Sequence, residues 1–165
     1  MRSWRSKSQK INADILNSMT PMQKLDSIYR KYGYYADANT YVVSPSAATT
    51  NAAFTAIRKA QKELGAGTKE KPAVLAGKVC KSYRDLTTGV DTSTADMKPT
   101  LPVDSKTHMV SCEVDDARFT VRGSGTEPKV KLYVESRGTS MEDAQQKADA
   151  LQRAIIDDWL SMLKS

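Results

Sequence analysis

The chain has 165 residues and a mass of 18.2 kDa, which is the size of one ordinary domain or of a small domain with a helical lead-in. Its 39% hydrophobic and 27% charged residues are globular proportions, so wholesale disorder and collagen-like repeats are excluded. No apolar run approaches the length of a membrane span, and no apolar stretch follows the basic N-terminus as it would in a secretory signal. We therefore expect a cytoplasmic protein with no membrane partner.

The net charge of +6 comes entirely from the first part of the chain. Residues 1–70 hold 11 Lys and Arg against 5 Asp and Glu, whereas residues 71–165 hold 14 of each. Such an excess suits a nucleic-acid footprint, because cations that neutralise phosphates release counterions. We favour a solvated helical face as its explanation, because the tyrosines of this region lack the strand pattern of a base-stacking platform. A basic nucleic-acid-binding module is therefore kept as the alternative function.

The cysteine and histidine content gives little support for a metal site or for redox chemistry. Cys80 and Cys112 are too far apart for a CxxC pair, so we expect free thiols and no metal site. The only histidine, His108, lies in a strand-like segment without evident partners, and we expect it to be structural.

The first part of the chain is expected to be mostly helical. Residues 4–18 predict a short peripheral helix, and Thr20 followed by Pro and then Gln23 forms a capping box that starts a second one. That second helix should end at Gly33. Further elements are predicted as a strand at 40–44 and a helix from about 47 to 64, before a lysine-rich linker at 68–71.

After the linker the hydrophobic period changes from 3.6 to 2, so we place a domain boundary near residue 70. A long polar loop is expected at residues 87–100. A final amphipathic helix should start at Ser140 and run through Trp159. Four strands are predicted in between, at residues 78–84, 109–114, 119–122 and 130–135. Four antiparallel strands covered by helices form a two-layer α+β domain.

The segment with the clearest chemistry is Arg-Gly-Ser-Gly-Thr-Glu-Pro-Lys at residues 122–129, between two alternating strands. Gly123 and Gly125 permit positive φ, so successive N–H groups could form an anion nest, and Ser124 and Thr126 add hydroxyl donors. An ordinary hairpin turn has the same composition. A regular register would place two cations on one strand face, which would then carry Thr120, Arg122, Lys131 and Tyr133.

The string Arg-x-Ser-Gly-Thr-Glu-Pro-Lys, followed by a strand ending in Tyr-Val-Glu, resembles the phosphate-binding loop of the α-D-phosphohexomutase superfamily. Tyr-Arg-Asp-Leu-Thr-Thr-Gly at residues 83–89 is similar to a segment of its phosphoglucomutase and phosphopentomutase branch, to which phosphomannomutase is related. The helix at residues 25–34 is similar to the family's connector between its third and fourth domains. The resemblance covers roughly residues 20–165.

This resemblance implies a TATA-box-binding-protein-like fourth domain at residues 70–165, preceded at residues 1–69 by a helical connector and the remnant of the previous domain. It assigns substrate phosphate binding to six residues of the loop and its neighbouring strand, which are Arg122, Gly123, Ser124, Gly125, Thr126 and Lys131. The implied partners are sugar phosphates and the remaining domains of the parent enzyme.

The family interconverts sugar 1-phosphates and 5- or 6-phosphates through an active-site phosphoserine, magnesium and a bisphosphate intermediate. The serine, magnesium and sugar loops that the resemblance calls for are not found in this sequence. We therefore expect no catalytic residue and no cofactor in this chain, magnesium only in the parent enzyme, and no activity of the chain alone.

Overall fold

A computed structural model describes residues 19–163. The helix expected at residues 4–18 lies outside the described residues. The chain divides into two compact units, one up to Tyr34 and one from Tyr35 onward. Among the described residues, no helix is long and apolar enough to cross a membrane.

The first unit contains helix α2, Pro21–Tyr32. Its predicted capping box is confirmed, because the Thr20 side chain accepts from the Gln23 N–H at 3.2 Å and the Gln23 side chain accepts from the Thr20 N–H at 2.8 Å. The helix ends at Gly33, whose φ of 97° is available to glycine at little cost.

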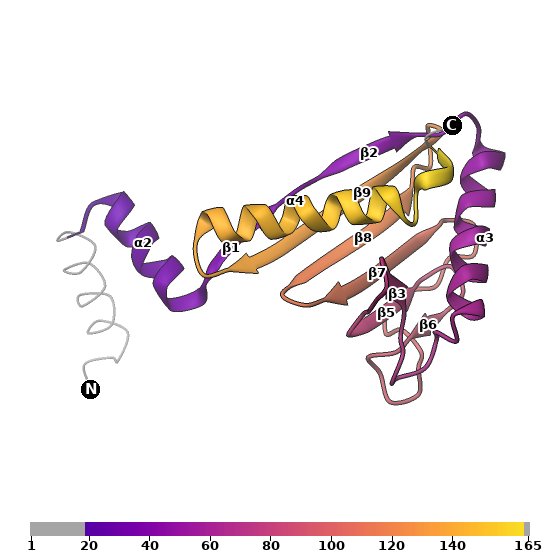
Figure 1. The fold of residues 1–165 in the computed structure, drawn as a ribbon, viewed down its shortest axis with the longest axis horizontal. Coiled ribbons are helices and arrows are strands. Elements are labelled where there is room, and N and C mark those ends of the chain that lie inside the picture. Colours follow the sequence, from indigo (N-terminus) through magenta and orange to yellow (C-terminus); the bar gives the residue numbers. More distant parts are fainter. Residues whose placement is uncertain (1–18, 164–165) are drawn as a thin grey trace, which may run out of the picture. The chain divides into compact units, whose positions relative to one another are not determined.

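The second unit is built on one seven-stranded sheet with the order β1-β9-β8-β7-β5-β6, in which β2 also pairs with β9 (Figure 1). The strands are β1 Tyr34–Asp37, β2 Thr40–Val43, β5 Ser82–Asp85, β6 Val90–Asp91, β7 Met109–Val114, β8 Ala117–Gly123 and β9 Lys129–Gly138. A separate two-stranded ribbon joins β3 Val74–Leu75 and β4 Lys78–Val79 antiparallel.

The α+β class and the antiparallel core of the sheet agree with the sequence prediction, and the expected number of strands does not. The predicted strands appear as the adjacent strands β5, β7, β8 and β9, joined antiparallel. The sheet is larger because β1 and β2 both pair with the ten-residue strand β9 on its side away from β8, and because β6 pairs with β5. The predicted strand at 78–84 is divided, since the Cys80 N–H turns away to donate to the Ala73 carbonyl at 2.8 Å. The expected loop at 87–100 contains β6.

Strands β1 and β2 and helix α3 (Ala47–Glu63) fall within the segment expected to be a connector, yet they belong to the compact unit that contains the sheet. The reason is burial. Phe54 on α3 has no exposed surface, and Ile57 is 5% exposed. A helix that buries such side chains gains roughly 1.5–3 kcal/mol for each by packing on the sheet.

Helix α4 (Met141–Asp157) lies across β8 and β9 and covers the core face of the sheet (Figure 1). Its predicted N-cap is confirmed, because the Ser140 side chain accepts from the Asp143 N–H at 3.1 Å. The side chains that point from β8 and β9 into this core are Phe119, Val121, Val130, Leu132 and Val134.

The last helix is shorter than expected. It stops at Asp157, and a turn leads into the short 3-10 helix η1, Ser161–Leu163. The turn lets Trp159 reach the core, where its ring meets Phe119 edge-on at 5.3 Å and its N–H donates to the Val74 carbonyl at 3.2 Å.

Candidate functional site

The predicted phosphate loop is the connection of the β8–β9 hairpin. Gly123 donates its N–H to the His108 carbonyl at 3.0 Å, and Ser124 donates to the Lys129 carbonyl at 2.9 Å. Within residues 19–163, the N–H groups of Gly125, Thr126 and Glu127 donate to no carbonyl. Three adjacent backbone donors are therefore available to a ligand at the tip of the hairpin.

The anion nest predicted from two glycines with positive φ is not present in this form. The glycines with positive φ in the described part of the chain are Gly33, Gly65, Gly67, Gly77 and Gly89. Neither Gly123 nor Gly125 is among them. Gly123 continues strand β8 and pairs with Val130, so its backbone is extended. The three free N–H groups of the loop therefore lie on a backbone without positive φ.

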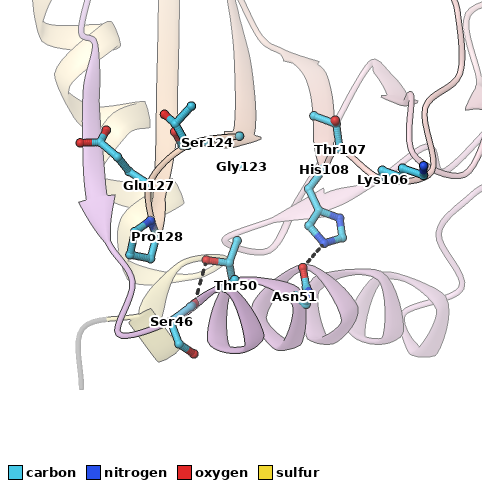
Figure 2. Close-up of a pocket in the computed structure, with 13 residues that line it drawn as sticks. Ser46, Thr50, Asn51, Lys106, Thr107, His108, Gly123, Ser124, Glu127 and Pro128 are labelled. Atoms are coloured by element: carbon cyan, nitrogen blue, oxygen red, sulfur yellow. Dashed lines mark hydrogen bonds between the residues drawn. The ribbon is translucent and has the colours of Figure 1, made fainter.

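A hollow of about 530 Å³ lies beside the loop. Figure 2 shows its walls, which are the loop with Gly123 and Ser124, the segment that carries Lys106 and His108, and the first turns of α3. The residues that line it are Ser46, Ala47, Thr50, Asn51, Lys106, Thr107, His108, Gly123, Ser124, Gly125, Thr126, Glu127 and Pro128.

The six residues predicted for phosphate binding divide into two groups. Gly123, Ser124, Gly125 and Thr126 line the hollow, whereas Arg122 and Lys131 do not. Those two cations are directly opposite each other on β8 and β9, on the sheet face away from the core residues. The predicted register and the sharing of one face by the two cations are confirmed.

Arg122 has an unusual environment for a guanidinium. Its Nε is buried and has no hydrogen-bond partner among the described residues. Because a buried unpaired donor costs about 1–3 kcal/mol, this atom is prepared to donate to an acceptor.

The negative charge of the loop is neutralised locally. Lys129 forms an ion pair and hydrogen bond with Glu127, which lowers the pKa of the Glu127 carboxyl and raises that of the Lys129 ammonium. The Lys129 ammonium also lies over the Tyr41 ring, 5.1 Å from its centre. An incoming anion therefore meets a paired carboxylate and not a free one.

His108 forms the far wall of the hollow and has the partners that the sequence did not reveal. Its ring stacks on Phe54 with centres 4.4 Å apart, its Nε2 lies 3.0 Å from Asn51 Oδ1, and its Nδ1 lies 3.3 Å from Arg58 Nη1. Burial, and then the positive charge of Arg58, lower the pKa of His108, so the ring is neutral at pH 7. The expectation of a histidine without partners is wrong, and its partners lie 50 and 57 residues away, beyond any local pattern.

Asp85, within the segment at residues 83–89, anchors this wall from inside the protein. Its carboxylate is fully buried and accepts from Arg58 Nε at 2.7 Å and from the Tyr83 hydroxyl at 3.1 Å. The N–H groups of Thr87 and Thr88 donate to its other oxygen. Burial alone would raise the pKa of Asp85, but these hydrogen bonds and the charge of Arg58 outweigh it and lower the pKa. Asp85 therefore stays ionised and holds both the turn and Arg58.

The sequence of this region matches the family model described as "Phosphoglucomutase/phosphomannomutase, C-terminal domain" over residues 108–153. This match includes the whole β8–β9 hairpin and most of α4. The chain carries the C-terminal domain of the phosphohexomutase superfamily. The resemblance stated from the loop is confirmed, and nothing in the comparisons supports the nucleic-acid-binding alternative.

Similarity to individual phosphohexomutase relatives extends further towards the N-terminus than the match to the family model does. The chain is 36% identical over 146 residues to a "probable phosphoribomutase" of Schizosaccharomyces pombe and 33% identical over 152 residues to the phosphoribomutase of Saccharomyces cerevisiae. It is also 30% identical over 155 residues to the glucose 1,6-bisphosphate synthase of Mus musculus. These matches cover 87–89% of this chain and 24% of each relative, so the chain spans about a quarter of the length of the curated relatives it matches.

Proposed function

We propose that this chain provides the substrate phosphate-binding site of a mutase that interconverts sugar 1-phosphates and sugar 5- or 6-phosphates. The observation that carries the proposal is the β8–β9 hairpin of a phosphohexomutase C-terminal domain, whose tip offers three free backbone donors above a hollow. A phosphate group has several oxygen acceptors and suits such a donor cluster.

Each predicted contact has its own part in this proposal. Ser124, Gly125 and Thr126 would hold the phosphate from the hollow side through hydroxyl and N–H groups, with Gly123 setting the start of the turn. Arg122 and Lys131 would approach from the open face of the sheet. The buried Nε of Arg122 supports this, since a phosphate oxygen would satisfy its missing hydrogen bond.

The transfer chemistry belongs outside the residues described. Within residues 19–163, no cluster of three or more His, Cys, Asp or Glu side chains could hold a metal ion, so these residues would not be the ones that bind the magnesium of the family. We propose that the phosphoserine, magnesium and sugar-selecting loops lie in other domains of a parent enzyme, which are this chain's partners. The chain itself would bind and orient one phosphate group, which lowers the barrier by positioning.

The finer structural assignments are part of the same proposal. The phosphate-binding domain, of TATA-box-binding-protein-like fold, would take in residues 70–165 together with β2 and α3, which belong to the same compact unit. The residues before this unit would connect it to a preceding domain. The parent enzyme would be cytoplasmic. The relatives named as phosphoribomutases and phosphopentomutases favour a pentose phosphate as the substrate.

The proposed function is tested by replacing the matched C-terminal segment of the Saccharomyces cerevisiae phosphoribomutase with this chain. We expect the chimera to have phosphoribomutase activity, and Arg122→Ala in it to lower kcat/KM about ten- to hundredfold through the loss of charged hydrogen bonds.

The matched control is Arg118→Ala. Arg118 is on the same strand and the same face, but its side chain is 64% exposed and lies 3.6 Å from Glu113. We expect this variant to keep the activity of the chimera. A folded chimera without activity, or equal losses in the two arginine variants, would contradict the proposed function.

A further inference from the structure

On the wall of the hollow opposite the loop, a network of hydrogen bonds connects four residues, which are in order Asp85, Arg58, His108 and Asn51. Asp85 accepts from Arg58 Nε at 2.7 Å and from Arg58 Nη2 at 3.2 Å, so the guanidinium is held in one orientation. Arg58 Nη1 then lies 3.3 Å from His108 Nδ1. Because a guanidinium can only donate, Nδ1 has to be the acceptor.

This acceptor role determines the tautomer of His108. A neutral imidazole that accepts at Nδ1 carries its proton on Nε2, which therefore donates to Asn51 Oδ1 at 3.0 Å. Figure 2 shows this bond reaching from His108 to the first turns of α3. Stacking of the ring on Phe54 fixes the plane in which the bond is made.

The consequence lies at Asn51. With Oδ1 occupied, its amide nitrogen cannot exchange places with the oxygen, and this nitrogen donates to no group among the described residues. Asn51 is exposed and lines the hollow. Its two N–H donors are therefore available to a molecule held there.

The geometry points to Asn51 as a specificity-determining residue that donates a hydrogen bond to a hydroxyl oxygen of the sugar whose phosphate is held by the loop. This inference rests on the proposed function and extends it from the phosphate to the sugar. The residues Asp85, Arg58 and His108 are positioning residues that act through Asn51.

A hydroxyl suits this donor better than a phosphoryl oxygen does. Asp85 neutralises the charge of Arg58, and Arg58 is linked to Asn51 through His108. Asn51 therefore offers neutral donors to the hollow. Charged groups and backbone donors at the loop already serve the phosphate. Neutral amide donors match neutral hydroxyl acceptors without desolvating a charge.

The inference is tested by measuring how tightly the whole chain binds ribose 5-phosphate, glucose 6-phosphate and inorganic phosphate. The dissociation constant of each ligand is obtained by proton–nitrogen NMR titration. We expect Asn51→Ala to weaken binding of at least one of the two sugar phosphates about three- to tenfold, and to change binding of inorganic phosphate by less than about twofold. A merely structural role of Asn51 would weaken all three ligands together.

Gln146→Ala is the matched control, because Gln146 is an exposed amide on α4 outside the hollow. We expect it to bind all three ligands as the unmodified chain does. Binding of both sugar phosphates that is unchanged by Asn51→Ala, or a loss shared equally with inorganic phosphate, would overturn the inference and leave the proposed function intact. No binding of any ligand by the unmodified chain would overturn both.

The positioning role is tested with His108→Phe, which keeps a ring to stack on Phe54 and removes both nitrogens. We expect the same selective loss as for Asn51→Ala, and no further loss in the double variant, because His108 acts through Asn51. Losses that add up in the double variant would show that His108 acts independently and would overturn this part. Amide spectra of each variant identify any that fails to fold.

Discussion

Arg58 and Asp85 join the interior of the protein to the hollow, and their energetics follow from unequal burial. The Asp85 side chain is 1% exposed and that of Arg58 is 21% exposed. Removing the partner of a buried charge costs more than the pair itself contributes, because the remaining charge is left without compensation.

We therefore expect Arg58→Ala to lower the free energy of unfolding by about 3 kcal/mol, measured by urea denaturation. Lys59→Ala is the control, since Lys59 is the next residue and its pair with Glu63, at 3.8 Å, is exposed. It should change the free energy by less than about 1 kcal/mol. Equal effects of the two substitutions would show that the Arg58 pair has no special role.

Residue-level prediction from the sequence succeeded where a strand pattern fixed the neighbours. Alternation on β8 and β9 placed Arg122 beside Lys131, and the register confirms it. It failed where a contact joins distant segments, as between His108 and Asn51, because nothing in the residues around either position indicates the other. About half of the residues that line the hollow could therefore not be predicted from the sequence, among them Ser46, Asn51 and Lys106.

At the scale of elements, the approach of β9 to α4 is the tightest described contact that involves a glycine. A Cβ added to Gly138 would meet the Ala144 backbone, with Cα at 2.8 Å and the amide nitrogen closer still. Ala144 lies in the first turn of α4 and its N–H bonds to the Ser140 carbonyl at 2.9 Å, so it cannot move aside without disturbing the cap.

Gly138→Ala should consequently lower the free energy of unfolding by about 2 kcal/mol or more, as overpacking against backbone does. Gly125→Ala is its matched control for stability, because an added Cβ there meets no atom within 4 Å and the backbone φ is not positive. Thermal unfolding of both variants measures the difference. A Gly138→Ala protein as stable as the control would contradict the packing described here.

Elements with strong local signals were predicted correctly, and those set by tertiary contacts were not. Capping residues located the starts of α2 and α4. The end of α4 was missed because Trp159 continues the helical spacing in sequence but reaches the core from a turn. The membership of β1 and β2 in the sheet depends on pairing with β9, more than 80 residues further along the chain.

At the scale of the whole molecule, the family match and the hollow cover different parts of the chain. The family model covers residues 108–153, whereas the hollow is completed by residues of α3 that precede this match. The compact unit from Tyr35 onward therefore contains all the residues that line the hollow. In our proposal, the tip of the β8–β9 hairpin binds the phosphate group of a sugar phosphate.

The most direct measurement of this claim is a map of backbone amide shifts in the whole chain as ribose 5-phosphate is added. We expect saturable shifts at the amides of Gly125, Thr126 and Glu127, weakened in Arg122→Ala and retained in Arg118→Ala. Binding should be weak, because association costs entropy that the contacts of one hairpin tip only partly offset. Shifts absent from residues 123–128, or unaffected by the loss of Arg122, would contradict the account.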